Sequence, residues 1–100
     1  MYGTIGHLVV KPGLETTLIQ YLREFEGVPI IISSSLYCID ASSHDYYWTI
    51  VWTSKEAHGA NASSAEFPAT YERLLTMLAS DPEWHSGECV YSKLGTTVIK

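Results

Sequence analysis

The hydrophobic pattern of this 100-residue chain changes its period several times, and the order of these changes limits the possible folds more than any other feature. Segments at 2–10, 30–40, 46–53 and 87–94 are rich in β-branched and aromatic residues, which is typical of strands. Helical patterns separate the first strand from the second and the third from the fourth. The resulting order, βαββαβ, predicts a ferredoxin-like α+β unit. In that unit the helices cover one face of a four-stranded antiparallel sheet with strand order 4-1-3-2.

The helical segments are recognised by apolar residues that recur every three to four positions. The first such stripe runs over 14–25, and a short helix is expected near 54–60. Two capping-box patterns, Thr53-x-x-Glu56 and Ser63-x-x-Glu66, predict where the short helix and the helix after it begin. The apolar stripe of the longer helix consists of Phe67, Tyr71, Leu74, Leu75 and Leu78.

The composition suggests that this single domain, residues 1–100, does not remain a free monomer. Charged residues make up 17% of the chain, against about 25% in an average soluble domain, and apolar residues make up 46%. Helices cover only one face of the predicted sheet, while its strands carry apolar residues on both faces. An apolar patch of that size is normally buried, so we expect a homodimer formed through the helix-free face, which gives a dimeric α+β barrel.

Charge and hydropathy argue against two large classes of partner. The net charge is −5 and the six basic residues are scattered, whereas nucleic-acid binding requires a positive stripe. The longest aliphatic run, at 30–32, is far shorter than the roughly 20 residues that cross a bilayer. We therefore expect a soluble, cytoplasmic protein that binds neither nucleic acid nor a membrane.

The two cysteines predict neither a disulfide nor a metal site. Cys38 and Cys89 fall on opposite edges of the expected sheet, about 14 Å apart at ~4.8 Å per strand step. A disulfide needs Cα atoms within roughly 7 Å. The chain also lacks the glycine-rich and HExxH motifs of nucleotide and zinc sites, so no cofactor and no metal are expected.

Three segments resemble the antibiotic biosynthesis monooxygenase (ABM) family: YGTIG at 2–6 running into VKPG at 10–13, WTSKEAH at 52–58, and DPEW at 81–84 after Tyr71. The resemblance covers nearly the whole chain. It implies a small homodimeric α+β barrel. Some members of this family oxidise polyketide phenols, anthrones or quinols with O₂ and without metal or flavin, while others degrade haem or have no known activity.

The resemblance also indicates which branch of the family to expect. The haem-degrading branch uses an Asn, a Trp and a His at positions that correspond here to Gly6, Asn61 and Tyr71, so all three residues differ. The quinone-forming branch uses an Asn, a Trp and a Tyr around a phenolic substrate. Asn61 and Tyr71 retain two of these residue types, and Trp52 is a possible substitute for the third.

Four residues are candidates for catalysis, and each has a structural alternative. The Tyr71 hydroxyl would bind a substrate phenolate, or its ring would simply fill the core. Asn61 would orient the substrate, or would end the short helix as a cap. His58 and His7 are the candidate bases. The alternative for His58 is that it is an ordinary surface histidine, and the alternative for His7 is that it is a buried histidine whose ring nitrogens are hydrogen-bonded within the protein.

Aromatic residues are expected to form the walls of a flat apolar pocket. We predict that Trp48, Trp52 and Phe67 bind a small aromatic ligand between the helices and the sheet, although rows of aromatic residues on a sheet are often only core. The favoured function is a cofactor-independent monooxygenase acting on an aromatic, quinol-like or polyketide-type substrate. The alternatives are a non-catalytic dimeric binding module of the same fold and, less favoured, a haem-degrading enzyme.

Overall fold

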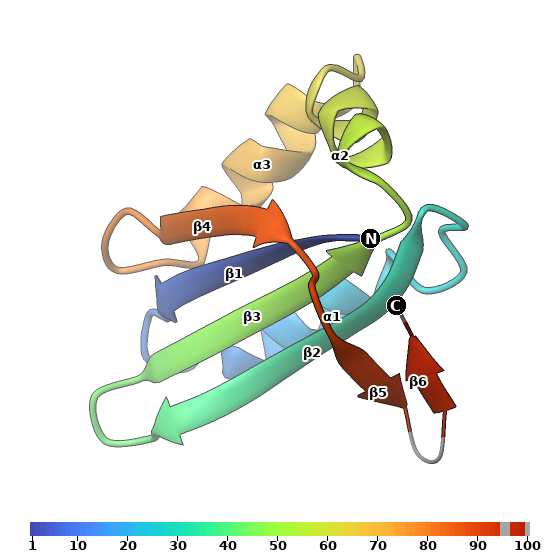
Figure 1. The fold of residues 1–100 in the computed structure, drawn as a ribbon. Coiled ribbons are helices and arrows are strands. Elements are labelled where there is room, and N and C mark those ends of the chain that lie inside the picture. The colour runs from blue at the N-terminus through green and yellow to red at the C-terminus, as the bar shows by residue number, and fades with distance from the viewer. Residues whose placement is uncertain (95–96, 100) are drawn as a thin grey trace.

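The helices and strands follow the order that the hydrophobic pattern predicts (Figure 1). The structure, a computed structural model, describes residues 1–94 and 97–99. The elements are β1 (Tyr2–Val9), α1 (Glu15–Arg23), β2 (Ile31–Asp40), β3 (Asp45–Trp52), α2 (Lys55–Ala62), α3 (Phe67–Thr76), β4 (Glu83–Glu88), β5 (Ser92–Leu94) and β6 (Thr97–Ile99).

Strands β1 to β4 form one antiparallel sheet in the order β2-β3-β1-β4, which confirms the predicted strand order. Figure 1 shows α1 and α3 on one side of this sheet, with α2 at its upper edge. β5 and β6 pair with each other in a separate two-stranded sheet. The ferredoxin-like α+β fold is therefore confirmed.

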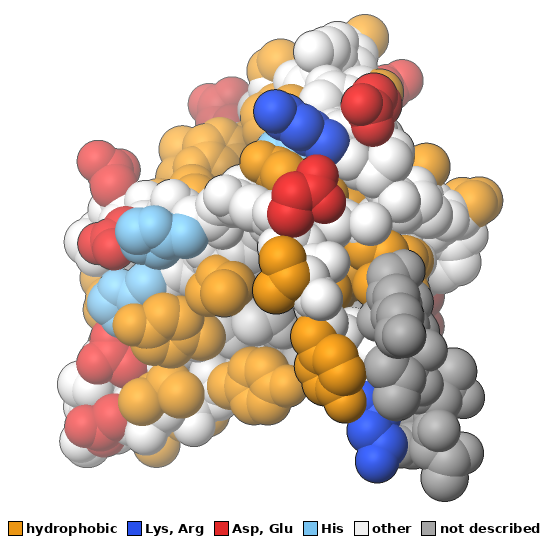
Figure 2. All heavy atoms as spheres, in the orientation of Figure 1, with side chains coloured by type: hydrophobic (Ala, Val, Ile, Leu, Met, Phe, Trp, Pro, Cys, Tyr) orange, Lys and Arg blue, Asp and Glu red, His pale blue; other side chains and the backbone are white. Residues whose placement is uncertain are grey.

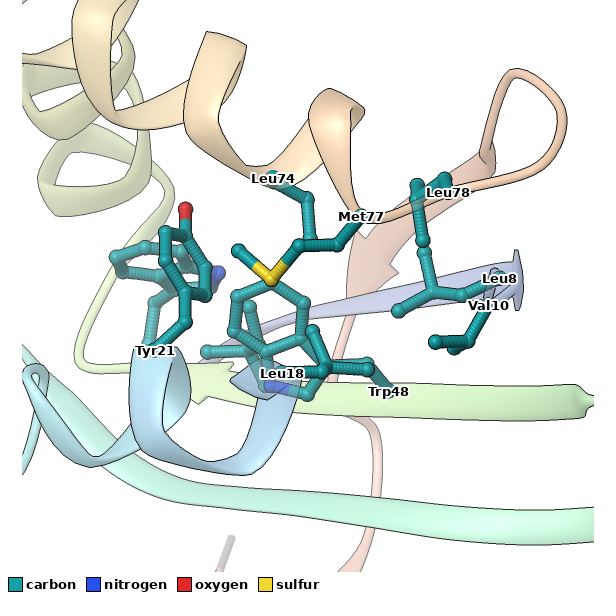
Figure 3. Close-up of a cluster of buried hydrophobic side chains, with 10 residues drawn as sticks. Leu8, Val10, Leu18, Tyr21, Trp48, Leu74, Met77 and Leu78 are labelled. Carbon is teal, nitrogen blue, oxygen red and sulfur yellow. The ribbon is translucent and has the colours of Figure 1, made fainter. Parts of the chain in front are cut away.

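The core lies between the helices and the sheet, and Figure 3 shows side chains from α1, α3 and the strands meeting there. Leu8 and Val10 from the first strand segment, Leu18 from α1 and Leu74 from α3 are almost completely buried. Burying a leucine side chain stabilises a fold by about 1.5–3 kcal/mol. These four side chains therefore hold both helices on the same face of β1.

The other face of the sheet is apolar, and no helix within residues 1–94 and 97–99 covers it. Figure 2, in the same orientation as Figure 1, shows hydrophobic side chains gathered over β1, β2 and β3. They include Ile5, Tyr37, Ile39 and Tyr47, which are 48%, 54%, 62% and 39% exposed. The prediction that the strands carry apolar residues on both faces is confirmed.

Both capping-box predictions are wrong in detail. Ser54, not Thr53, caps α2, and its hydroxyl accepts a hydrogen bond from the Ala57 backbone N–H at 3.0 Å. Thr53 instead extends the sheet pairing, since its own N–H donates to the Ile30 carbonyl at 2.9 Å. Ser63 is the C-cap of α2, and α3 begins at Phe67 without a side-chain cap.

The last strand of the main sheet begins earlier than predicted. β4 covers Glu83–Glu88 rather than 87–94, and it pairs with β1 along its length. The shift occurs because α3 ends at Thr76 and the residues directly after it pair with the end of the first strand. Leu78 forms a bridge with Val10 instead of extending the helix, so the chain reaches the sheet edge within a few residues.

The prediction of two free thiols is confirmed, because Cys38 and Cys89 are both unpaired. Cys38 lies in the edge strand β2 and Cys89 follows β4 at the opposite edge. Over residues 1–94 and 97–99, no group of three or more His, Cys, Asp or Glu side chains is arranged to hold a metal ion. None of the helices in this part of the chain is both long and apolar enough to span a membrane.

Candidate functional site

A cavity of about 750 Å³ lies between the sheet and the helices. Its walls come from every layer of the fold, and they are mainly aromatic and aliphatic. Six of the seven predicted site residues line it: Trp48, Trp52, His58, Asn61, Phe67 and Tyr71. The volume exceeds the roughly 300 Å³ at which ligand pockets begin, so the cavity has room for an aromatic ring system.

Tyr71 projects from α3 into this cavity, where its hydroxyl has a partner that the sequence did not suggest. Tyr71 lies one turn after Phe67, and the two rings stack with centroids 5.5 Å apart and an interplanar angle of 14°. The indole N–H of Trp84 in β4 donates a hydrogen bond to the Tyr71 Oη atom at 2.9 Å. Trp84 therefore belongs to the site, although our sequence analysis did not select it.

Trp84 fits over the sheet because the neighbouring position in β1 is a glycine. Gly6 pairs with Trp84 on one side and with Trp48 on the other. A Cβ atom on Gly6 would overlap Cζ3 of the Trp84 ring and lie 2.6 Å from its Cε3 atom. A glycine inside a strand often marks such a close approach, so Gly6 was the available sequence signal for a bulky neighbour.

His58 and Asn61 enter the cavity from α2, which begins at the Ser54 cap. The His58 ring packs edge-on against Trp52, with centroids 5.2 Å apart. Asn61 lies in the last turn of α2, and the C-cap of this helix is Ser63. Asn61 is therefore not the cap of α2, which was the structural role considered as the alternative to substrate binding.

A small cluster of polar side chains lies on the sheet side of the cavity, and the sequence did not point to it. The Trp52 indole N–H donates to Thr4 Oγ1 at 3.2 Å, and Thr4 Oγ1 lies 3.2 Å from Ser86 Oγ. Thr4 and Ser86 face each other across β1 and β4. This network holds the Trp52 ring in place as a wall, and both hydroxyl residues line the cavity.

The structure places His7 on the opposite side of the sheet from the cavity. Because side chains alternate along β1, His7 points with Ile5 to the helix-free face, whereas Thr4 and Leu8 point toward the helices. His7 Nε2 lies 2.8 Å from Asp45 Oδ1, and its ring packs against Tyr47. The interaction with His7 lowers the pKa of Asp45. His7 therefore cannot reach a ligand in the cavity, so the geometry contradicts its prediction as a base there.

The electrostatic setting of the cavity is close to neutral. Among the described residues that line it, Glu66 is the single acidic residue and none is Lys or Arg. Burial raises the pKa of Tyr21 to about 12, and its hydroxyl donates to the Thr70 carbonyl at 3.0 Å. Tyr21 is therefore a protonated wall residue at neutral pH.

Comparison with known proteins identifies the fold. A protein from Chloroflexus aurantiacus J-10-fl described as an antibiotic biosynthesis monooxygenase superimposes with a TM-score of 0.73 at 26% identity. The match covers 96% of this chain and 98% of that one. The chain has the fold of the antibiotic biosynthesis monooxygenase family. No protein-family model and no curated protein sequence matches it significantly.

Other proteins that share this fold at lower identity include one of unknown function. A protein of Caulobacter crescentus CB15, also described as an antibiotic biosynthesis monooxygenase, has a TM-score of 0.72 at 16% identity, with 89% of each chain covered. A Nitrosomonas europaea protein of unknown function has a TM-score of 0.70 at 16% identity, with 96% of this chain and 95% of that one covered. The function of this ABM-fold chain must therefore be argued from its own site.

The residues of this chain do not fit the haem site of the haem-degrading ABM branch. At the position of the first-strand Asn, Gly6 offers no side chain, and the Trp84 ring occupies the space above it. At the position of the His ligand, the Tyr71 oxygen accepts a hydrogen bond from Trp84. At the position of the Trp, Asn61 presents an amide.

Proposed function

We propose that this chain is an ABM-type monooxygenase that uses O₂, without metal or flavin, to oxidise a small aromatic quinol, phenol or anthrone in the cavity. The observation that supports this most strongly is the convergence of Tyr71, Asn61 and His58 on one aromatic-walled space of about 750 Å³. The three residues come from two helices and represent a hydrogen-bond donor, an amide and a base.

Each residue has a role that follows from its chemistry. Trp48, Trp52 and Phe67 provide flat apolar walls on which an aromatic ring can pack. Tyr71 and Asn61 hydrogen-bond the substrate oxygen and so fix the orientation of the ring. His58 takes the acidic proton of the substrate, since a neutral imidazole is an effective base near neutral pH.

Removing that proton prepares the substrate for direct reaction with O₂. The electron-rich anion passes one electron to O₂, and the two radicals combine to form a C–O bond. For an anthrone-type CH₂ group, breaking the O–O bond then leaves one oxygen atom on carbon as a carbonyl. The other oxygen leaves as water with the two hydrogens, so four electrons pass from the substrate to one O₂.

Oxygen consumption by the purified chain tests this function. Hydroxyanthrones and naphthohydroquinones are supplied without added metal or flavin, and spontaneous oxidation is subtracted. We expect catalysed uptake with at least one of them. We expect a loss of about 10- to 100-fold in Tyr71→Phe, the effect of one hydrogen bond to a charged group. Tyr37→Phe removes a hydroxyl from the helix-free face and serves as the matched control.

A non-catalytic binding module is the second candidate, and the Trp84–Tyr71 hydrogen bond favours it. This bond already satisfies the Tyr71 oxygen as an acceptor, which is also what a purely structural tyrosine requires. Tight binding of an aromatic compound without any catalysed O₂ uptake across the panel would support the module and contradict the monooxygenase.

We also propose that a second copy of the chain covers the helix-free face. Ile5, Tyr37, Ile39 and Tyr47 lie together there as large apolar side chains that are 39–62% exposed, and a contiguous patch of this kind usually marks an interface. A two-fold contact through this face would bury them and leave the cavity, on the other side of the sheet, open to its ligand.

A further inference from the structure

We propose that Trp84 is a positioning residue: it holds the Tyr71 hydroxyl so that its proton is donated to an oxygen atom of the ligand. This inference rests on the proposed function, because it concerns how the same cavity recognises its substrate. Neither the sequence motifs nor the ABM resemblance assigns Trp84 a role. The argument depends on the direction of one hydrogen bond and on what holds its two partners in place.

The direction of this bond follows from the chemistry of the two groups. An indole nitrogen only donates, whereas a phenolic hydroxyl has one proton to donate and lone pairs that accept. In the 2.9 Å contact between Trp84 Nε1 and Tyr71 Oη, the tyrosine oxygen must therefore be the acceptor. Its own proton is not used in this bond and remains available to a ligand oxygen in the cavity that both residues line.

Packing on both sides restricts the pair to this geometry. The Trp84 ring lies directly above Gly6 and packs in a T-shaped arrangement with Trp48, with centroids 5.9 Å apart. On the other side, Phe67 stacks on the Tyr71 ring. Neither ring can turn away without losing contacts, so the hydroxyl is oriented before a ligand enters. Such preorganisation reduces the entropic cost of binding.

A hydroxyl that accepts one hydrogen bond also becomes a better donor, because the bonds in a chain polarise one another. The chain here runs from the Trp84 N–H to the Tyr71 oxygen and from its proton to the ligand. Trp84 should therefore strengthen the binding of ligands that carry a phenolic oxygen or phenolate. It should contribute only packing to ligands that carry none.

Two neutral probes of the same ring size separate these contributions: 2-naphthol, which carries the oxygen, and naphthalene, which does not. Their dissociation constants are measured by titration calorimetry. The wild-type protein should prefer 2-naphthol by about 10-fold. Trp84→Phe keeps an aromatic ring and removes the N–H that orients Tyr71, so it should reduce this preference by up to about 10-fold, the effect of the one neutral hydrogen bond from Tyr71 to the ligand.

Trp52→Phe is the matched control. Trp52 lines the same cavity, but its N–H donates to Thr4 and not to Tyr71. This variant should weaken both probes by similar factors and leave the preference unchanged. Tyr71→Phe should abolish the preference. The double variant Tyr71→Phe/Trp84→Phe should then show the same lack of preference as Tyr71→Phe alone. Gly6→Ala, which displaces the Trp84 ring without altering its chemistry, should reduce the preference as Trp84→Phe does.

The outcomes distinguish this inference from the function on which it rests. If Trp84→Phe and Gly6→Ala weaken both probes equally, Trp84 is only a wall and the inference is wrong, while the cavity remains a binding site. If the wild-type protein binds neither probe, the proposed function fails and the inference fails with it. A selective loss for 2-naphthol in both variants supports the inference.

Discussion

Replacing Gly6 by alanine adds a single methyl group at the closest approach between β1 and the candidate site. The new Cβ atom would overlap the Trp84 ring, so either the ring or the strand must move. The ring cannot move freely, because its N–H is bonded to Tyr71 and it packs in a T-shaped arrangement with Trp48. We therefore expect Gly6→Ala to destabilise the folded chain.

The magnitude follows from the two ways of relieving the overlap. Forcing an extra methyl group into a packed interior costs about 1–3 kcal/mol. Expelling the Trp84 ring instead costs about 0.5–1.5 kcal/mol for the hydrogen bond, together with the lost burial of the indole. A domain of this size loses roughly 4–8 °C of Tm per kcal/mol, so we expect Tm to fall by roughly 4–24 °C.

Gly3→Ala provides the control on the same strand. A Cβ atom on Gly3 would lie 3.7 Å from the Ile50 carbonyl oxygen and 3.9 Å from that of Gly87, which are ordinary contacts. Because alanine restricts the unfolded chain more than glycine does, this variant should be as stable as the wild type or more stable by up to about 1 kcal/mol.

Thermal unfolding followed by circular dichroism measures both variants at the same protein concentration. Tryptophan fluorescence shows whether the environment of the indole rings has changed. Equal Tm values for Gly6→Ala and Gly3→Ala would refute the reasoning, because they would mean that the Trp84 ring does not occupy the space above Gly6.

Three further predictions concern parts of the molecule outside this contact. The raised pKa of Tyr21, about 12 in the fold against 10.0 for an ordinary tyrosine, means that only the unfolded state loses this proton between those pH values. The free energy of unfolding should therefore fall by up to about 2–3 kcal/mol across this window in urea titrations, and Tyr21→Phe should lack that part of the fall. Ile5→Asp should convert the expected homodimer into monomers in sedimentation experiments, whereas Ile19→Asp, at a similarly exposed position on α1, should not; a wild-type monomer at micromolar concentration would contradict the dimer. Thiol titration of the unreduced, denatured chain should detect both Cys38 and Cys89, and a value near zero would reveal the disulfide that their placement on opposite edges opposes.

Much of the fold was readable from local pattern, because each element buries one side of itself. Alternation along residues 2–10 places Leu8 and Val10 on one face and Ile5 and Val9 on the other, and the structure buries the first pair. The apolar stripe over residues 14–25 likewise contains Leu18 and Tyr21, and both lie in the core. Periodicity works here because side-chain direction depends only on backbone geometry, which is the same in every strand or helix.

The residues at which helices and strands begin and end were less predictable, because they depend on hydrogen-bond partners from other segments of the chain. Both Thr53 and Ser54 are suitable caps by residue type; in the structure Ser54 takes the role, while Thr53 extends the sheet by its bond to Ile30. The start of β4 depends in the same way on how the chain after α3 is tied to β1. These bonds join residues far apart in the sequence, so no local window contains both partners.

The candidate site, like the fold, was predictable from the sequence only in part. Its residue types, an aromatic group with Tyr71, Asn61 and His58, were selected from the sequence by their chemistry and by the ABM resemblance. Tertiary structure alone determined that His7 lies behind the sheet and that Trp84 lies above Gly6 and donates to Tyr71. The reason is physical: a sequence specifies which groups a segment carries and which way they face along it. The distance between two groups on different segments exists only after the sheet has paired and the helices have packed on it.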